Sequence, residues 1–86
     1  MERIDALNAI RAALVAVVPE QEVPAVLDES STFLTDLNIH SLETLDVAAK
    51  AQLALRVKIG RQSLSQIQSV GELVDLLLVA PAVPLR

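Results

Sequence analysis

The sequence contains no cysteine, tryptophan or tyrosine, and Phe33 is its only aromatic residue. Without cysteine, the chain forms no disulfide, carries no thiolate of its own and cannot build a zinc finger. The single histidine, His40, is too few for a multi-histidine metal site within one chain. The core must therefore be aliphatic, and we expect Phe33 to lie inside it rather than in a ligand site.

An excess of basic residues is also missing, because 11 acidic and 7 basic residues give a net charge of −4. A nucleic-acid-binding protein typically has a basic patch with aromatic platforms, and this sequence has neither. The longest apolar run, 76–85, contains two prolines and is far shorter than the about 20 residues of a membrane span. The N-terminus has acidic residues and no apolar signal segment. We therefore expect a cytoplasmic protein that binds neither nucleic acid nor membrane.

Hydrophobic residues make up 52% of the 86 residues, which is enough for one small domain with a modest core. We predict that domain over 1–80 and a flexible tail over 81–86. So short a chain has little room for a walled pocket, and this argues against an enzyme. Nothing in the composition requires more than a monomer.

Helical spacing of apolar residues predicts helices over 2–18, 41–57 and 70–79, with a short helical segment within 61–68. Pro19 and Pro81 end the first and the last of these, and Ser69 with Glu72 has the spacing of a capping box. No segment shows the alternation of a strand. The predicted fold class is therefore all-α: a small four-helix bundle of three main helices and one short helix, with a long loop between the first and second helices.

The stretch 19–40 contains two prolines and no sustained period, which predicts that long loop. Loops of this length in small domains often carry function. Asn38 or Ser41 is the predicted N-cap of the helix that follows. Six apolar residues are expected to hold the loop against the core: Val23, Val26, Leu27, Phe33, Leu34 and Leu37.

The helix over 41–57 has two apolar rows, although a helix that packs on one side needs only one. The first row consists of Leu42, Leu45, Ala49 and Leu53. The second consists of Val47, Ala51, Ala54 and Leu55, with Ala48 beside it. The pattern leaves open whether both rows belong to the core or one is a docking surface for another protein.

Ser41 is the candidate functional residue, because it lies where the long loop meets the start of a helix. A helix N-terminus favours negative charge, so a phosphate ester on this hydroxyl is well tolerated there. The simpler alternative is that Ser41 is only a cap. A hydrolase that uses Ser41 and His40 is a weaker alternative, since adjacent residues point in different directions and no oxyanion hole is evident.

Acidic residues flank Ser41 on both sides. They form either a solvated face, a docking edge for basic partners or a weak Mg²⁺ contact during modification. The group consists of Asp28, Glu29, Asp36, Glu43 and Asp46.

The stretch FLTDLNIHSLETLDVAAKAQLALRVKI, followed by LSQIQSVGELVDLLL, resembles the acyl carrier and peptidyl carrier protein family. The family pattern has an apolar residue, Asp-Leu-Gly, two residues and Ser-Leu, then a long helix, a short helix and a Thr/Ser-Val start to the last helix. Asp36-Leu37, Ser41-Leu42, Leu55, Ile59, Ser69-Val70 and Leu73 match it in order. The match covers about residues 32–78, and 2–18 fits the first helix of the family more loosely.

The resemblance implies a carrier that catalyses nothing itself. A phosphopantetheinyl transferase would attach 4′-phosphopantetheine from coenzyme A to Ser41, and acyl or aminoacyl groups would be carried as thioesters. Its partners would be a loading enzyme and a ketosynthase or other acyltransferases of a polyketide, fatty-acid or nonribosomal-peptide pathway. Small residues at Ala48, Ala51 and Ala54 would leave room for an apolar cargo.

Three departures from the family pattern shape this expectation. Asn38 stands where the family has glycine, and His40 precedes the serine as in many peptidyl carriers. Because the long helix has few acids, we expect an apolar docking interface rather than a purely electrostatic one. The expected docking residues are Asp36, His40, Leu42, Leu45, Asp46, Ala49 and Leu53. The alternative is a helical adaptor with the carrier fold and no prosthetic group.

Overall fold

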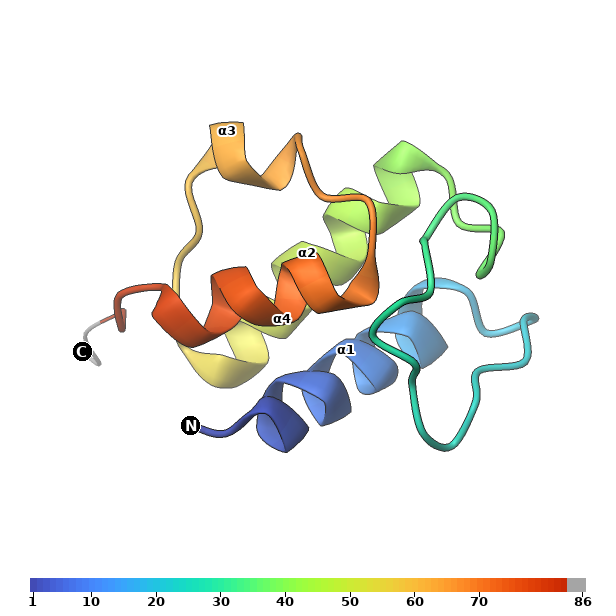
Figure 1. The fold of residues 1–86 in the computed structure, drawn as a ribbon, viewed down its shortest axis with the longest axis horizontal. Coiled ribbons are helices and arrows are strands. Elements are labelled where there is room, and N and C mark those ends of the chain that lie inside the picture. Colours follow the sequence, from blue (N-terminus) through green and yellow to red (C-terminus); the bar gives the residue numbers. More distant parts are fainter. Residues whose placement is uncertain (84–86) are drawn as a thin grey trace.

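The structure is a computed structural model that describes residues 1–83, which contain four helices and no β-strand. The helices are α1 (Arg3–Val17), α2 (Ser41–Leu55), α3 (Arg61–Leu64) and α4 (Val70–Val79). In Figure 1, α4 crosses α2, α1 lies below both and α3 lies at the top. The predicted all-α class is confirmed, and α4 has its predicted bounds. None of these helices is both long and apolar enough to cross a lipid bilayer.

Two helix ends follow the expected local rules. The capping box of α4 is confirmed, because the Glu72 N–H donates to Ser69 Oγ at 3.2 Å and the Ser69 N–H donates to Glu72 Oε1 at 2.9 Å. Helix α1 ends at Val17, two residues before Pro19, which has no N–H to continue it. Side-chain chemistry that is readable in the sequence therefore sets these two boundaries.

The start of α2 differs from the prediction. Its N-cap is His40, neither Asn38 nor Ser41, and the His40 N–H donates to Glu43 Oε1 at 3.3 Å. Asn38 has a φ of 57°, in the left-handed region that asparagine adopts more readily than most residues. The chain therefore turns before the helix, and Ser41 becomes its first helical residue.

Helix α3 is the short helical segment predicted within 61–68, and it occupies the first half of that stretch. It ends at Leu64, and the residues after it pair with the segment before α2. The Phe33 N–H donates to the Gln68 carbonyl at 2.9 Å, and Thr32 forms an antiparallel bridge with Ser69. These contacts require extended backbone at 68–69 and so prevent the helix from continuing.

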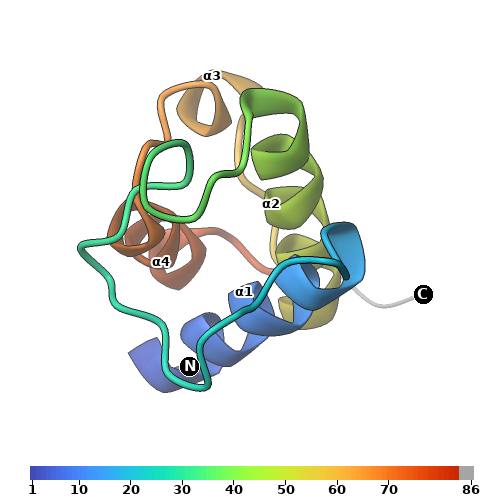
Figure 2. The same ribbon diagram turned by 90° about the vertical axis from the view of Figure 1, so that its right-hand side faces the viewer.

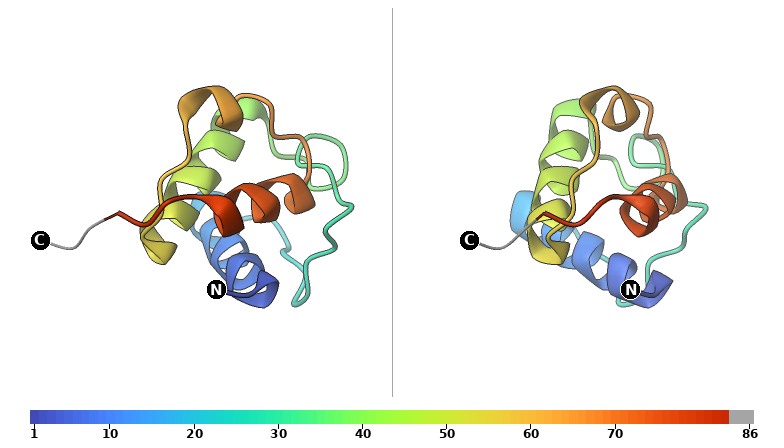
Figure 3. Two further views of the ribbon diagram at one scale, coloured as in Figure 1. Left: turned by 60° about the vertical axis from the view of Figure 1, so that its left-hand side comes forward. Right: turned by 90° about the vertical axis from the view of Figure 1, so that its left-hand side faces the viewer.

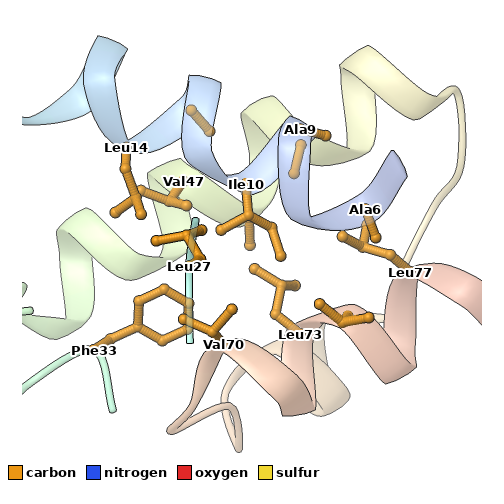
Figure 4. Close-up of a cluster of buried hydrophobic side chains, with 14 of the residues drawn as sticks. Ala6, Ala9, Ile10, Leu14, Leu27, Phe33, Val47, Val70, Leu73 and Leu77 are labelled. Carbon is orange, nitrogen blue, oxygen red and sulfur yellow. The ribbon is translucent and has the colours of Figure 1, made fainter. Parts of the chain in front are cut away.

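The core lies between α1, α2 and α4, and it is aliphatic except for Phe33. Figure 4 shows Ile10 and Leu14 of α1 facing Leu73 of α4, with Phe33 below them. Phe33 is 2% exposed, which confirms its expected place in the core. Helix α4 contributes four buried residues, Val70, Leu73, Val74 and Leu77.

The segment 18–40 crosses the side of the molecule that faces the viewer in Figure 2 and is held by the first turn of α4. The Val70 N–H donates to the Ser31 carbonyl at 3.0 Å, and the Gly71 N–H donates to the Glu29 carbonyl at 2.8 Å. A Cβ on Gly71 would lie 2.9 Å from that carbonyl oxygen, which is why the close approach needs glycine. Arg3 of α1 adds ion pairs to Glu29 and Asp75.

Two of the six residues expected to hold this segment do not. Val26 is 81% exposed and Leu34 is 66% exposed, whereas Leu27 and Phe33 beside them are buried. Both exposed residues lie in bends or turns, where the neighbouring residue takes the inner position. Val23 and Leu37 pack against the core as partly buried residues.

The first three residues of the predicted tail, 81–83, pair with the chain that leaves α2. The Lys58 N–H donates to the Pro81 carbonyl at 3.1 Å, and the Val83 N–H donates to the Arg56 carbonyl at 2.8 Å. Residues 81–83 therefore run antiparallel to the chain that leaves α2, as Figure 3 shows. Prolines end a helix, but they leave carbonyls free to accept hydrogen bonds. The rest of the predicted tail, 84–86, lies outside the described residues.

Candidate functional site

Ser41 is exposed at the first position of α2, and the residue that places it there is Ile39. Ile39 is 2% exposed, and its N–H donates to the Phe33 carbonyl at 2.7 Å. With Ile39 inside and the left-handed Asn38 before it, the chain emerges at His40 and starts the helix in solvent. Ile39 was not among the residues predicted to hold the loop, although an isolated apolar residue between two polar ones, Asn38 and His40, is a usable signal.

His40 contacts the helix rather than the serine. Its Nε2 lies 3.3 Å from Glu43 Oε1, and the same carboxylate oxygen accepts the His40 N–H. Within the described part of the chain, no hydrogen bond joins the imidazole to Ser41. The geometry therefore gives a His40–Glu43 pair next to Ser41 and no base aimed at the hydroxyl.

Two acidic residues that the sequence singled out already have local partners. The Asp36 carboxylate accepts the Thr32 N–H at 2.8 Å and the Thr32 hydroxyl at 3.1 Å, so it stabilises its own turn. The Asp46 Oδ1 lies 3.8 Å from the Nζ of Lys50, which is one helical turn later in α2. Both side chains remain at the surface, where a partner can reach them.

The lowered pKa values lie elsewhere in the segment 18–40. A hydrogen bond from Arg3 holds the pKa of Glu29 below its usual value. Hydrogen bonds from the Ser30 side chain and then the Ser30 backbone do the same for the pKa of Asp28. These hydrogen bonds stabilise the segment 18–40, and neither Asp28 nor Glu29 lines the groove beside Ser41. Residues 1–83 contain no cluster of three His, Asp or Glu side chains able to hold a metal ion.

A groove of about 630 Å³ begins beside Ser41. The chain before α2, the first turns of α2, and α3 with the residues after it form its walls. Its lining is mostly apolar, and the contribution from around α3 was not predicted from the sequence. Beside Ser41, the apolar lining residues include Phe33, Ile39, Leu45, Leu64 and Ile67.

The two apolar rows of α2 have different environments. The first row is exposed: Leu42 by 74%, Leu45 by 41% and Leu53 by 79%, with Ala49 exposed between them. Most of the second row is core, and the fully buried residues are Val47, Ala48 and Ala51.

These environments change one expectation. Ala48 and Ala51 are packed inside the core and Ala54 is exposed, so the three alanines do not leave room for a cargo as expected. The groove beside Ser41 is lined by other residues instead.

Comparison with other proteins adds no relative: no protein-family model, curated protein or solved structure matches this chain. The resemblance to carrier proteins therefore rests on the motif residues around Ser41 and on the position of that serine in the fold.

Proposed function

We propose that this protein is an acyl carrier that holds 4′-phosphopantetheine on Ser41. The observation that supports this most directly is the exposed hydroxyl at the first residue of α2. A serine there is open to a modifying enzyme, which a serine inside the aliphatic core would not be. The carrier would act in the cytoplasm and pass acyl or aminoacyl groups between enzymes of a polyketide, fatty-acid or nonribosomal-peptide pathway.

The residues around Ser41 fit a phosphodiester. The first N–H groups of a helix have no partner within the helix and carry its positive dipole end, so they favour an anion. The carboxylate of Glu43, two residues after Ser41, already accepts the His40 N–H at 3.3 Å and lies 3.3 Å from the His40 Nε2. Its oxygen is therefore turned toward the N-cap of α2.

The bound group would supply a thiol, which this cysteine-free chain lacks and which forms thioesters with the cargo. The side-chain oxygen of Ser41 would join the phosphopantetheine group to the chain. In the modification, its hydroxyl would lose a proton to a base of the transferase and bond to a phosphorus of coenzyme A, while the bond from that phosphorus to the departing adenosine bisphosphate would break. The transferase brings the Mg²⁺ for this step.

The groove beside Ser41 and the exposed row of α2 support the rest of the proposal. An apolar cargo held near Ser41 would meet Phe33, Leu45 and Ile67 rather than water. The transferase, a loading enzyme and a ketosynthase or other acyltransferase would dock on Asp36, His40, Leu42, Leu45, Asp46, Ala49 and Leu53. Tethering would raise the effective concentration of the cargo at each partner.

Intact mass spectrometry tests this function. The protein is incubated with coenzyme A, Mg²⁺ and a broad-specificity phosphopantetheinyl transferase. We expect the mass of one phosphopantetheine group to be added, and Ser41→Ala to abolish the addition. Ser63→Ala, an exposed serine of α3, is the matched control and should leave it unchanged.

A chain that gains no mass with any transferase would refute the carrier function. That outcome would favour the adaptor without a prosthetic group. Ester hydrolysis by the unmodified protein that is lost in His40→Ala would favour a hydrolase instead.

A further inference from the structure

The basic residues of this acidic protein are concentrated in one stretch. Four of the seven lie within 50–61, and no acidic residue lies between Asp46 and Glu72. The net charge of −4 therefore conceals a positive region at the C-terminal end of α2. A local charge of one sign selects partners of the other sign and speeds their encounter.

A second groove, of about 490 Å³, lies in this positive region. We call it the C-terminal groove. The end of α2 supplies one wall, and the antiparallel bridge between Val57 and Ala82 places Val83 at the other. Its residues are Ala49, Gln52, Leu53, Arg56, Val57, Lys58 and Val83.

The two cations of the C-terminal groove have no ion-pair partner within residues 1–83. Among residues 1–83 the ion pairs join Arg3, His40 and Lys50 to carboxylates, and neither Arg56 nor Lys58 takes part. Arg56 is also held in the left-handed conformation, with a φ of 57°, where α2 ends. Both residues are exposed beside Leu53, which is 79% exposed.

We propose that the C-terminal groove binds an acidic, amphipathic segment of a partner protein. Apolar side chains of that segment would cover Leu53 and Val83, which are both exposed in the groove, and its carboxylates would pair with Arg56 and Lys58. Charge complementarity favours this occupant, because both charged residues of the groove are positive and the same groove contains the exposed Leu53.

The C-terminal groove is continuous with the exposed row of α2. Ala49 and Leu53 belong to both, and Leu42 at the other end of the row lies next to Ser41. The 15 residues of α2 span about 20 Å at 1.5 Å per residue. One partner that follows the row would therefore reach Ser41 and the basic end together. The binding itself goes beyond the carrier function and does not need Ser41.

A pair of synthetic helical peptides tests the inference on the full, unmodified chain. One has leucine on one face and glutamate on the other, and its counterpart has every glutamate replaced by lysine. Binding is followed by NMR on the isotope-labelled protein. We expect the glutamate peptide to shift amide signals of residues 49–58 and the lysine peptide to leave them unchanged.

Charge reversal provides the decisive comparison. Arg56→Glu with Lys58→Glu should weaken binding of the glutamate peptide about tenfold and should create binding of the lysine peptide. Arg61→Glu reverses one charge in the same basic stretch but outside the groove. It should have little effect, whereas Arg56→Glu alone and Lys58→Glu alone should each weaken binding of the glutamate peptide. Ser41→Ala should bind as the unaltered chain does, so a failure here is separate from a failure of the carrier function.

The apolar part has an equally matched control. Leu53→Glu should weaken binding of the glutamate peptide, whereas Val79→Glu, at the end of α4 and also 79% exposed, should not.

Four outcomes would overturn the inference. The first is that the two peptides bind equally, and the second is that Arg61→Glu weakens binding as much as the double reversal. The third is that phosphatidylglycerol vesicles bind through Arg56 and Lys58 while the glutamate peptide does not, which would indicate that the groove binds a membrane surface. The fourth is that the chain forms a dimer that Leu53→Glu abolishes, which would indicate that a second copy of the chain occupies the groove.

Discussion

The two faces of α2 distribute side-chain size in opposite ways. The buried face has small residues, Ala48 and Ala51, together with Val47. The exposed face has Leu42, Leu45 and Leu53. Burying a leucine stabilises a protein more than burying an alanine, so folding alone would favour the reverse arrangement.

The contrast shows what each face is adapted to. Small residues inside allow α1 and α2 to pack closely, and both alanines are fully inaccessible. Leucines outside contribute little to the stability of the isolated chain, and exposed apolar rows of this kind mark interaction surfaces. The first face therefore serves folding, and the proposed function assigns the second to docking; two experiments test that division.

The largest expected effect comes from enlarging a residue on the buried face. Ala51→Leu should lower the free energy of unfolding by about 1–3 kcal/mol, because the packed core has no space for the added carbons. Ala49→Leu makes the same change on the exposed face and should stay within about 0.5 kcal/mol. Urea unfolding followed by circular dichroism measures both. Equal losses in the two variants would contradict the division of α2 into two faces.

A smaller effect is expected when charge is placed on the exposed face. Leu45→Glu should keep the native helicity while slowing the modification of Ser41 about fivefold, the effect of removing one contact worth 1 kcal/mol. Val15→Glu on α1 is the control, because Val15 is 45% exposed and Leu45 is 41% exposed. Unfolding of Leu45→Glu would place the row in the core. Equal slowing by Val15→Glu would show that the effect is not specific to α2.

The smallest effect concerns the segment that holds Ser41 in place. The hydrogen bond from Arg3 lowers the pKa of Glu29 in the folded state, so this pair contributes stability above the ordinary glutamate pKa of about 4.3. The contribution is lost as pH falls through the lowered, folded-state pKa. Arg3→Gln should therefore flatten the loss of stability in acid, measured as thermal midpoint against pH.

Some acid sensitivity should remain in Arg3→Gln, because Ser30 also lowers the pKa of Asp28. A variant with the same pH profile as the unaltered chain would show that the Arg3–Glu29 pair does not contribute.

Much of the helical framework was predictable from the sequence, because its signals are local. The stops at Pro19 and Pro81, the capping box at Ser69 and the apolar spacing of 70–79 each act within one or two turns. The burial of Phe33 was predictable for a related reason, because burying the largest apolar side chain of the sequence stabilises the fold most.

Features that depend on distant partners were not predictable. The two rows of α2 are equally apolar in sequence, and only the approach of α1 decides which is buried. Helix α3 stops at Leu64 because Gln68 pairs with Phe33, far away in the sequence. The pairing of residues 81–83 with 56–58 left no local signal either.

The close contact between Gly71 and the Glu29 carbonyl has a mechanical consequence. From there, short backbone hydrogen bonds lead from Gln68 to Phe33 and from Phe33 to Ile39, two residues before Ser41. Backbone hydrogen bonds thus connect the segment before Ser41, the attachment point of the proposed arm, to the chain that enters α4. The reach of a swinging cargo would then be set by the length of the arm itself, and orienting it would be the task of the enzyme that receives it.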